Sequence, residues 1–313
     1  MKQTLFLFLL TISLYAIEAT RLHMGTYITI SLPTANNMQL NQTFEIFAQE
    51  DRRFSTYKPS SEISKLNTLG YQTLSPNAHE LIKKALQISI ETDGYFDITV
   101  GRLTNSTYKF NREDATLPTP AKLALEKRSV GFHNIELNDN FAKLDKKSQV
   151  DFGGIAKGYT VDLVAKYAKE QNLTQGVIAA SGDIHCIDKC LIAIAHPFYQ
   201  GKNLASFNTK ANGISITTSG NYERYIKNKN NNHLLNPKSG KSGQNFASVT
   251  LITHSNNTDI DAYATAVSVM PIDKAYAFLK KKTDIAYLIT QRSGETKMSD
   301  NIMEFVKDLT FYE

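Results

Sequence analysis

The sequence predicts an α+β fold. Apolar and polar residues alternate at residues 27–32 and 248–253, which is typical of strands that bury one face. Apolar residues recur at helical spacing in residues 77–92, 157–171 and 273–282, which predicts three amphipathic helices. These elements do not follow the regular rhythm of a doubly wound βαβ sheet, so a purely α/β fold is not favoured.

The composition is that of a globular protein with a substantial core. The 313 residues are 42% apolar, and no low-complexity stretch or internal repeat divides them. The formal net charge is +5, with Lys and Arg scattered along the chain. Because proteins that bind the nucleic-acid backbone need a concentrated basic surface, nucleic acid is not an expected partner.

The N-terminus has the pattern of an export signal. Lys2 provides a positive start, and the uncharged residues 5–17 suit a signal peptide but are short for a membrane span. With cleavage after Ala19, residues 1–19 form the signal peptide and residues 20–313 the mature domain, which is exported to the periplasm. An uncleaved N-terminus that anchors the protein to the membrane is the alternative.

Polar segments mark three connections in the chain. Residues 111–120 form a surface connection that ends near Pro118 and Pro120 and leads into a short helix. Residues 228–233 are expected to form a polar turn between two extended pieces, and residues 240–243 a second turn.

Residues 151–162, DFGGIAKGYTVD, place an acid, a glycine turn and a lysine ahead of a predicted helix. Glycine allows a backbone to approach a ligand closely, and a helix N-terminus offers free N–H groups with partial positive charge. This arrangement suits a ligand that carries phosphate.

The two cysteines, Cys186 and Cys190, have three residues between them and apolar runs on either side. This spacing predicts a hairpin with the two thiols opposite each other. In an oxidising compartment they can form a disulfide, and two unpaired thiols are the alternative. A pair of cysteines without two further nearby ligands does not indicate a zinc site.

Residues 257–265 are expected to open a helix. Asp261 and Thr265 then stand at positions i and i+4, so two oxygen ligands share one helix face. This arrangement suits Mg²⁺, which accepts one or two carboxylates and leaves other positions for water and phosphate. The alternative is structural, because Thr258 and Asp261 can also form an N-terminal capping pair.

Taken together, eight segments between residue 24 and about residue 270 resemble the ApbE family of flavin transferases in order and spacing. Each segment is weak evidence alone, but their combination is specific. They are residues 24–26 (MGT), 55–67 (STYKPSSEISKLN), 94–103 (GYFDITVGRL), 151–158 (DFGGIAKG), 181–184 (SGDI), 218–224 (TSGNYER), 233–240 (HLLNPKSG) and 261–265 (DAYAT).

This resemblance implies a single ApbE-like domain, related to the T-fold, with mixed or antiparallel sheets and packed helices. Proteins of this family bind FAD, use Mg²⁺ to break its pyrophosphate, and attach FMN to a Thr or Ser of a partner flavoprotein, with AMP as the other product. By resemblance, the metal ligands are Asp261, Thr265 and the backbone oxygens of Gly154 and Ala264.

The resemblance also implies a set of FAD contacts, each of which has a structural alternative. The aromatic residues can offer flat faces to a ring or serve as core residues, Asp97 can serve as a turn residue, and Lys157 can be an ordinary solvated residue. The FAD contacts are Met24, Tyr57, Tyr95, Phe96, Asp97, Asp151, Lys157, Leu234 and Leu235.

The expected catalytic residues are Lys157, Asp261 and His233. Phosphoryl transfer needs alignment and charge neutralisation, for which Lys157 and a metal on Asp261 are suited. His233 is the candidate to accept the proton of the incoming hydroxyl or to orient a phosphate, and a structural histidine is the alternative. Ser181 and Asn236 depart from the usual Gly and Asp of the family, but both proposed metal-binding side chains are retained.

Two other functions use the same site: an FAD pyrophosphatase that releases FMN and AMP, and a non-catalytic periplasmic FAD-binding protein. For the transferase, the expected partners are FAD and an exported or membrane-associated acceptor flavoprotein of an electron-transfer system.

Overall fold

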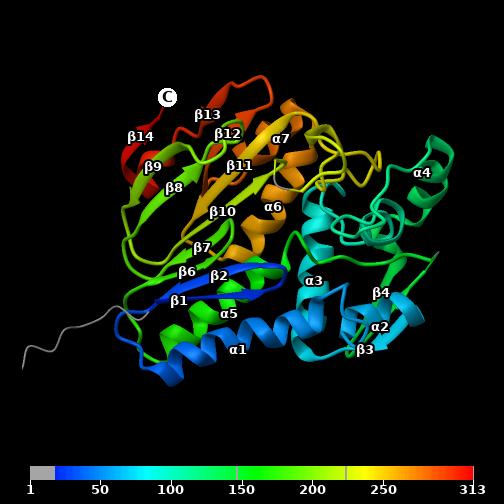
Figure 1. Cartoon of the computed structure of the whole chain (residues 1–313), viewed down its shortest axis with the longest axis horizontal. Coiled ribbons are helices and arrows are strands. Elements are labelled where there is room, and N and C mark those ends of the chain that lie inside the picture. The colour runs from blue at the N-terminus through cyan, green and yellow to red at the C-terminus, as the bar shows by residue number, and fades with distance from the viewer. Residues whose placement is uncertain (1–17, 146, 223, 313) are drawn as a thin grey trace, which may run out of the picture.

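The computed structural model describes residues 18–145, 147–222 and 224–312, which form three sheets with helices packed around them (Figure 1). The main sheet of the described residues has eight strands in the order β1-β2-β6-β7-β10-β11-β12-β13. All neighbouring strands in it are antiparallel. The strands are β1 (Glu18–His23), β2 (Thr26–Ser31), β6 (Val177–Ala180), β7 (Asp183–Cys186), β10 (Ile214–Gly220), β11 (Phe246–Thr253), β12 (Ile285–Gln291) and β13 (Thr296–Met298).

Two sheets of three strands accompany the main sheet, in the orders β14-β9-β8 and β3-β5-β4. The first covers one face of the main sheet, because Ile194 and Phe207 of the small sheet share an apolar cluster with Ile216 and Leu288 of the main sheet. The strands are β3 (Tyr71–Thr73), β4 (Ile135–Asn138), β5 (Phe141–Leu144), β8 (Leu191–Ala195), β9 (Asn203–Thr209) and β14 (Val306–Phe311).

Helices cover the other face of the main sheet. All eight residues of β11 are buried, with Leu251 in the cluster on the helical side and Ile252 in the cluster below the small sheet. Helix α5 packs on β6 and β7, α6 packs on β10 and β11, and α1 lies against α5 (Figure 1). The helices are α1 (Asn37–Phe54), α2 (Glu62–Leu69), α3 (Pro76–Glu91), α4 (Pro120–Glu126), α5 (Ala156–Glu170), α6 (Asn257–Val269), α7 (Ile272–Lys280) and α8 (Ile302–Phe305).

The elements predicted from apolar spacing are confirmed within two residues at each end, as α3, α5, α7, β2 and β11. Local sequence explains some of these boundaries. Helix α3 begins at Pro76 because the Ser75 side chain accepts from the Ala78 N–H and proline is favoured at the first helical position.

Two of the three expected connections are present, and the turn expected at residues 240–243 lies a few residues earlier, where the Asn236 N–H donates to the Lys241 carbonyl. The segment 111–120 leads into α4, and residues 228–233 contain a short 3₁₀ turn, Lys229–Asn231. The extended pieces around this turn are not named strands. They are held by isolated antiparallel bridges between Tyr225 and Asn232 and between Leu235 and Ser242.

The hairpin expected around the cysteines is wrong, although the disulfide is present. Strand β7 is paired on both edges, with β6 and β10, so it has no free edge for β8. The chain instead crosses from the main sheet to the small sheet. Cys186 and Cys190 are joined by a disulfide at the two ends of this crossing.

The predicted signal peptide lies mostly outside the described residues. Its last two residues, Glu18 and Ala19, form the start of β1 and pair with Ser31 and Ile30. Within the described residues, no helix combines the length and the apolar character needed to cross a bilayer.

Candidate active site

The candidate site lies where the N-terminal turns of α5 and α6 meet. A Cβ atom on Gly158 would lie 2.5 Å from the backbone oxygen of Asn257 and 2.8 Å from the Cβ of Asp261. Only glycine therefore allows the two helices to come this close. The Gly158 N–H donates to Asp261 Oδ2 at 3.1 Å, which ties α5 to α6 at this point.

Lys157, Asp183 and Asp261 form a charged cluster beside this contact. Lys157 Nζ lies 2.5 Å from Asp183 Oδ2 and 3.6 Å from Asp261 Oδ2, and the two Asp side chains are only 2% and 4% exposed. The hydroxyl of Thr217 donates to the other oxygen of Asp183. Lys157 is thus not an ordinary solvated residue, because it neutralises two buried carboxylates.

The two carboxylates of this cluster carry more negative charge than the single Lys157 ammonium offsets, which favours a further cation. Burial alone would lower the pKa of Lys157, but Asp183 and Asp261 outweigh it and hold the pKa above its ordinary value. Burial, and after it the charge of Asp183, raises the pKa of Asp261 to about 7. A carboxylate in this state is stabilised in its ionised form by a further positive charge.

Four oxygens were predicted to hold Mg²⁺, and the donor set fits a hard cation. A Cβ on Gly154 would lie 2.7 Å from Thr265 Oγ1, so these two residues are in close contact. Within the described residues, no hydrogen-bond donor is found for Asp261 Oδ1, Thr265 Oγ1 or the Gly154 carbonyl. Ala264 differs, because its carbonyl accepts from Ser268 Oγ at 2.7 Å.

The described residues contain no cluster of three or more His, Cys, Asp or Glu side chains suited to a metal. The proposed set has a different character, with one carboxylate, one hydroxyl and two carbonyls. Oxygen donors of this kind suit Mg²⁺, which keeps positions for water and substrate phosphate.

The capping pair considered for Thr258 and Asp261 is wrong. Helix α6 is capped by Asn256, whose side chain accepts from the Asp259 N–H at 2.8 Å. Thr258 binds Asp162 of α5 instead, because Asp162 points at the free N–H groups of the first α6 turn.

Asp162 fixes the N-terminus of α6 through both carboxylate oxygens. They accept from the N–H groups of Asn257 and Thr258, each at 2.8 Å, and from the Thr258 hydroxyl at 2.5 Å. Burial raises the pKa of Asp162 to about 6, so the carboxylate is ionised at pH 7. It thereby holds in place the helix that carries Asp261 and Thr265.

We expect Asp162→Ala to lower the free energy of unfolding by about 2–3 kcal/mol, because buried donors on Asn257 and Thr258 lose their acceptor. Urea unfolding at pH 7, followed by circular dichroism, measures this loss. Asp162→Asn keeps one acceptor oxygen and should lose less. Equal stability of the wild type and the Ala variant would show that the α6 N-terminus does not depend on Asp162.

His233 lies on the loop that follows β10, next to Arg224. Its N–H and Nδ1 contact the Arg224 carbonyl at 3.0 and 3.2 Å. Because a carbonyl only accepts, Nδ1 carries the proton and Nε2 is left as an acceptor. Burial, and then the charges of Arg224 and Lys157, lower the pKa of His233 to about 4.

Two predicted FAD contacts, Met24 and Tyr57, keep partly accessible surfaces. Met24 has a φ of 51°, which is uncommon for a non-glycine residue, and its sulfur lies 3.6 Å from Thr160 Oγ1 of α5. Tyr57 is 55% exposed, donates to the Phe110 carbonyl, and has the Arg112 guanidinium 5.5 Å from its ring centre.

The three residues of the 95–97 run are all engaged in the fold. Tyr95 is buried with the Lys238 ammonium 4.7 Å from its ring centre, and Phe96 belongs to the main apolar core. Asp97 accepts from the N–H and the hydroxyl of Thr99, as a turn residue does. Their contact with FAD stays a prediction.

The remaining predicted FAD contacts are Asp151, Leu234 and Leu235. Asp151 accepts from the Gly153 N–H at 2.8 Å and from the Thr104 hydroxyl at 2.6 Å, so its orientation is set on both sides. Leu234 and Leu235 are buried in separate apolar clusters. Their burial agrees with the structural alternative and does not test contact with FAD.

Sequence patterns did not indicate Thr104 or Arg224. Thr104 lies in an irregular π-helical turn, Arg102–Tyr108, which no apolar periodicity marks. Arg224 is the last residue of the 218–224 motif, but nothing in the motif indicates that its carbonyl orients His233. The ion pair of Asp183 with Lys157 joins segments that are distant in sequence, so no local pattern indicates it.

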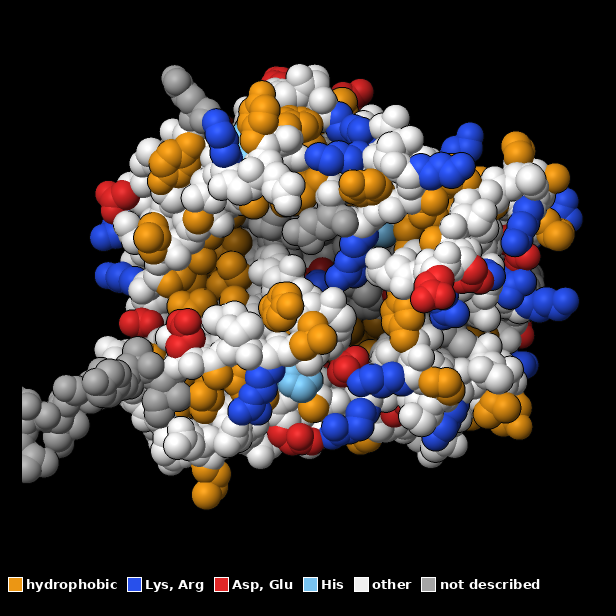
Figure 2. Space-filling model, viewed as in Figure 1, with side chains coloured by type: hydrophobic (Ala, Val, Ile, Leu, Met, Phe, Trp, Pro, Cys, Tyr) orange, Lys and Arg blue, Asp and Glu red, His pale blue; other side chains and the backbone are white. Residues whose placement is uncertain are grey.

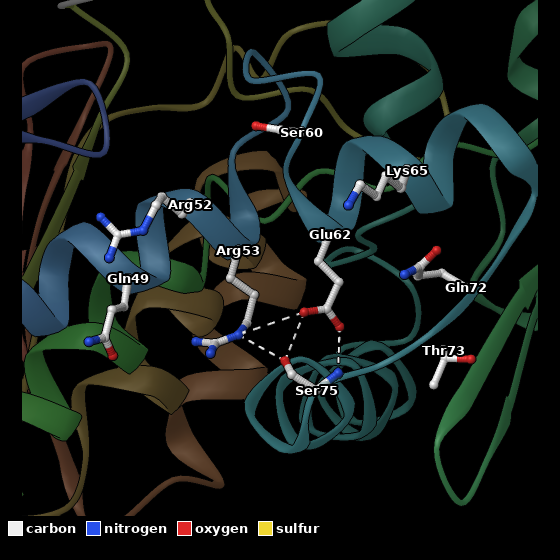
Figure 3. Close-up of a pocket in the computed structure, with 9 residues that line it drawn as sticks. All are labelled: Gln49, Arg52, Arg53, Ser60, Glu62, Lys65, Gln72, Thr73 and Ser75. Carbon is white, nitrogen blue, oxygen red and sulfur yellow. Dashed lines mark hydrogen bonds and ion pairs between the residues drawn. The ribbon is translucent and has the colours of Figure 1, made fainter.

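Two open cavities in the described residues do not coincide with this site. One, of about 600 Å³, lies between β1 and α1. The other, of about 440 Å³, lies beside α1, α2 and β3, and its Arg53, Glu62 and Ser75 bind one another (Figure 3). Figure 2 shows a hollow over α6, the helix that contains Asp261 and Thr265, with both acidic and basic side chains visible in it.

The sequence is similar to that of known proteins. The ApbE family model matches residues 24–289. The FAD:protein FMN transferase of Chlamydia muridarum is 29% identical, and the alignment covers 88% of each chain. The FAD:protein FMN transferase of Haemophilus influenzae is 28% identical over 85% of this chain and 83% of its own.

Solved structures resemble the whole fold. The ApbE protein of Thermotoga maritima has a TM-score of 0.85 at 24% identity, over 94% of this chain and 100% of its own. The flavin transferase ApbE of Vibrio cholerae has a TM-score of 0.79 at 21% identity, over 93% and 99%. These likenesses confirm the expected α+β fold class.

Proposed function

The chain belongs to the ApbE family, and on that premise we propose that it is an Mg²⁺-dependent FAD:protein FMN transferase. The reaction joins the FMN phosphate of FAD to a Thr or Ser hydroxyl of a partner flavoprotein. A phosphoester bond forms, the pyrophosphate bond breaks, and AMP leaves with the bridging oxygen.

The observation that supports this proposal best is the meeting of α5 and α6. It brings Gly154, Thr265 and Asp261 together next to Lys157, with three oxygens that have no donor among the described residues. Asp261, Thr265 and the Gly154 carbonyl would hold Mg²⁺, and we include the Ala264 carbonyl as a further ligand. A bound Mg²⁺ supplies charge neutralisation at the pyrophosphate.

The side chains of the site have separate tasks. Lys157 keeps its charge in a site shielded from water, where it can offset phosphate charge. Asp183 holds the Lys157 ammonium in position through the 2.5 Å contact. His233 presents an unprotonated Nε2, which can accept the proton of the incoming hydroxyl.

We expect His233 to titrate near pH 4 rather than near its ordinary 6.5. Because the folded-state pKa is lowered, the unfolded chain binds more protons between these values, and stability falls as pH decreases from about 6.5 to 4. Transfer activity should show no inflection near pH 6.5 from this group. NMR of the imidazole nitrogens and a pH profile of kcat check this, and a histidine inflection near 6.5 that disappears in His233→Gln would contradict it.

One assay separates the transferase from its two alternatives. The purified protein is incubated with FAD, Mg²⁺ and an exported candidate flavoprotein that contains Thr or Ser acceptors. Flavin fluorescence on the denatured acceptor supports transfer, free FMN and AMP support an FAD pyrophosphatase, and unchanged bound FAD supports a flavin-binding protein. We expect fluorescence on the acceptor.

The acceptor we propose is an exported or membrane-associated flavoprotein of an electron-transfer system. Export through a signal peptide of residues 1–19 would place this chain in the periplasm, and the Cys186–Cys190 disulfide is in keeping with an oxidising compartment. Mass spectrometry of the mature N-terminus distinguishes cleavage after Ala19 from an uncleaved membrane anchor.

A further inference from the structure

One long segment of the chain has no acidic side chain. Residues 224–258 contain five basic residues and no Asp or Glu, so the segment has a formal charge of +5, as large as the net charge of the whole chain. All five lie in residues 224–243, which we call the basic loop. They are Arg224, Lys227, Lys229, Lys238 and Lys241.

The basic loop borders the candidate active site, because it contains His233 as well as Arg224. At its base, the Arg224 carbonyl orients His233, and the charges of Arg224 and Lys157 both act on that imidazole. Its outer part contains the exposed turn Lys229–Asn231, which Arg292 holds through a 2.7 Å hydrogen bond to Asn230. The loop therefore has a defined position at the border of the site.

Much of the positive charge on this loop has no counter-charge. Lys227, Lys229 and Lys241 are exposed, and none of the three pairs with a carboxylate in the described parts of the chain. Lys238 differs, since it lies 2.9 Å from Asp93. Figure 2 shows basic side chains gathered above the central hollow, over the loops that Figure 1 colours yellow.

An exposed aromatic residue lies next to these charges. Tyr225 is 46% exposed and lies between the active-site end of the loop and Lys227. Tyrosine is enriched in protein interfaces, and charges at the rim of an interface steer the partner and accelerate association. A surface of this kind at the border of an active site suits a macromolecular substrate with opposite charge.

We propose that the basic loop is the docking surface for an acidic segment of the acceptor protein. This inference rests on the proposed transferase function, because the acceptor must bring its hydroxyl to the site that the loop borders. FAD is also anionic, but Lys157, which pairs with Asp183 inside the site, is available to offset its phosphate charge, whereas Lys227 and Lys229 are exposed to solvent.

Charge reversal on the loop tests the proposal. The variant is Lys227→Glu with Lys229→Glu, and the matched control is Lys166→Glu with Lys307→Glu, which changes two exposed lysines on α5 and β14. The probes are two labelled synthetic peptides, each with one threonine at the same position. In the acidic peptide the threonine is flanked by Asp and Glu, and in the neutral peptide these residues are replaced by Asn and Gln. Fluorescence anisotropy measures their binding at ionic strengths of about 10 mM and about 150 mM, where the Debye lengths are about 30 Å and about 8 Å.

We expect the wild type and the control to bind the acidic peptide about tenfold more tightly than the neutral one at low salt, and less selectively at high salt. The loop variant should lose this preference while its Kd for FAD stays within about twofold of the wild-type value. Equal binding of both peptides by the wild type, or an unchanged preference in the loop variant, overturns the proposal.

Two further outcomes would show that the basic loop binds a ligand other than the acceptor, and would also overturn the proposal. Loss of FAD affinity in the loop variant, in parallel with loss of peptide binding, would mean that the loop attracts FAD. Loop-dependent binding to phosphatidylglycerol vesicles, with no peptide preference, would mean that it faces a membrane.

Failure of the docking proposal is distinguishable from failure of the proposed function. Peptide binding is measured without turnover, whereas transfer is detected as the added mass of FMN on a protein acceptor. Transfer without charge dependence overturns only the docking surface. Charge-dependent binding with free FMN as the only product overturns the transferase function instead.

Discussion

Asp261→Asn is expected to reduce FMN transfer on the order of 10²–10³-fold, since a metal at a reacting phosphate contributes several kcal/mol and each 1.4 kcal/mol is a factor of ten. The amide removes the charge that would hold Mg²⁺ but keeps an oxygen that can accept from the Gly158 N–H. Steady-state kinetics over a range of Mg²⁺ concentrations, together with calorimetric titration of Mg²⁺, measure the effect.

Asp259→Asn is the matched control on the same helix. Asp259 lies one half-turn before Asp261, but its carboxylate pairs with Lys84 at 2.7 Å and lies in the first turn of α6. We expect activity close to wild type and a loss of up to about 1 kcal/mol of stability. Full activity and unchanged Mg²⁺ affinity in Asp261→Asn would remove Asp261 from the metal site.

The Asp261 variant also separates a catalytic role from a structural one. The substitution removes repulsion between Asp261 and Asp183, although it weakens the contact with Lys157 at 3.6 Å. These effects oppose each other, so we expect the free energy of unfolding to change by less than about 2 kcal/mol. A loss of activity without unfolding is then a property of the site.

Local sequence predicted the elements whose boundaries depend on local physics. In helices α3, α5 and α7, apolar residues recur every three or four positions and form one apolar face. This face packs against the core regardless of how the helices are connected. The failed hairpin between β7 and β8 shows the limit. The neighbours of β7 are β6 and β10, and β10 is distant from β7 in the sequence. No residue pattern near Cys186 or Cys190 could therefore predict this pairing.

The same distinction holds for the site. The spacing of Asp261 and Thr265 predicted that they share a helix face, and α6 contains both. The ion pair of Lys157 with Asp183 and the bonds of Asp162 to α6 join residues that are distant in sequence, so spacing could not predict them. The family resemblance placed Gly154 and Thr265 together, and their close contact agrees with that placement.

Lys157→Met is expected to lower transfer on the order of 10²-fold or more and to lower the free energy of unfolding by about 3–5 kcal/mol at pH 8. The substitution leaves Asp183 and Asp261 buried and without their shared counter-charge. Urea unfolding across pH 4 to 8, with and without Mg²⁺, measures the cost, and transfer kinetics measure the activity.

The pH dependence of this cost follows from the two carboxylates. Without Lys157, the folded-state pKa of at least one of them rises, so the folded chain binds more protons than the unfolded chain. The deficit relative to wild type should therefore be small near pH 4 and grow as pH rises. Lys157→Arg keeps the charge and should keep the wild-type pH profile, even if the larger guanidinium lowers stability.

If Mg²⁺ binds at Asp261, it should stabilise Lys157→Met more than the wild type, because the cation then replaces the missing ammonium. A Met variant whose deficit is the same at pH 4 and pH 8 would mean that Lys157 does not neutralise these carboxylates.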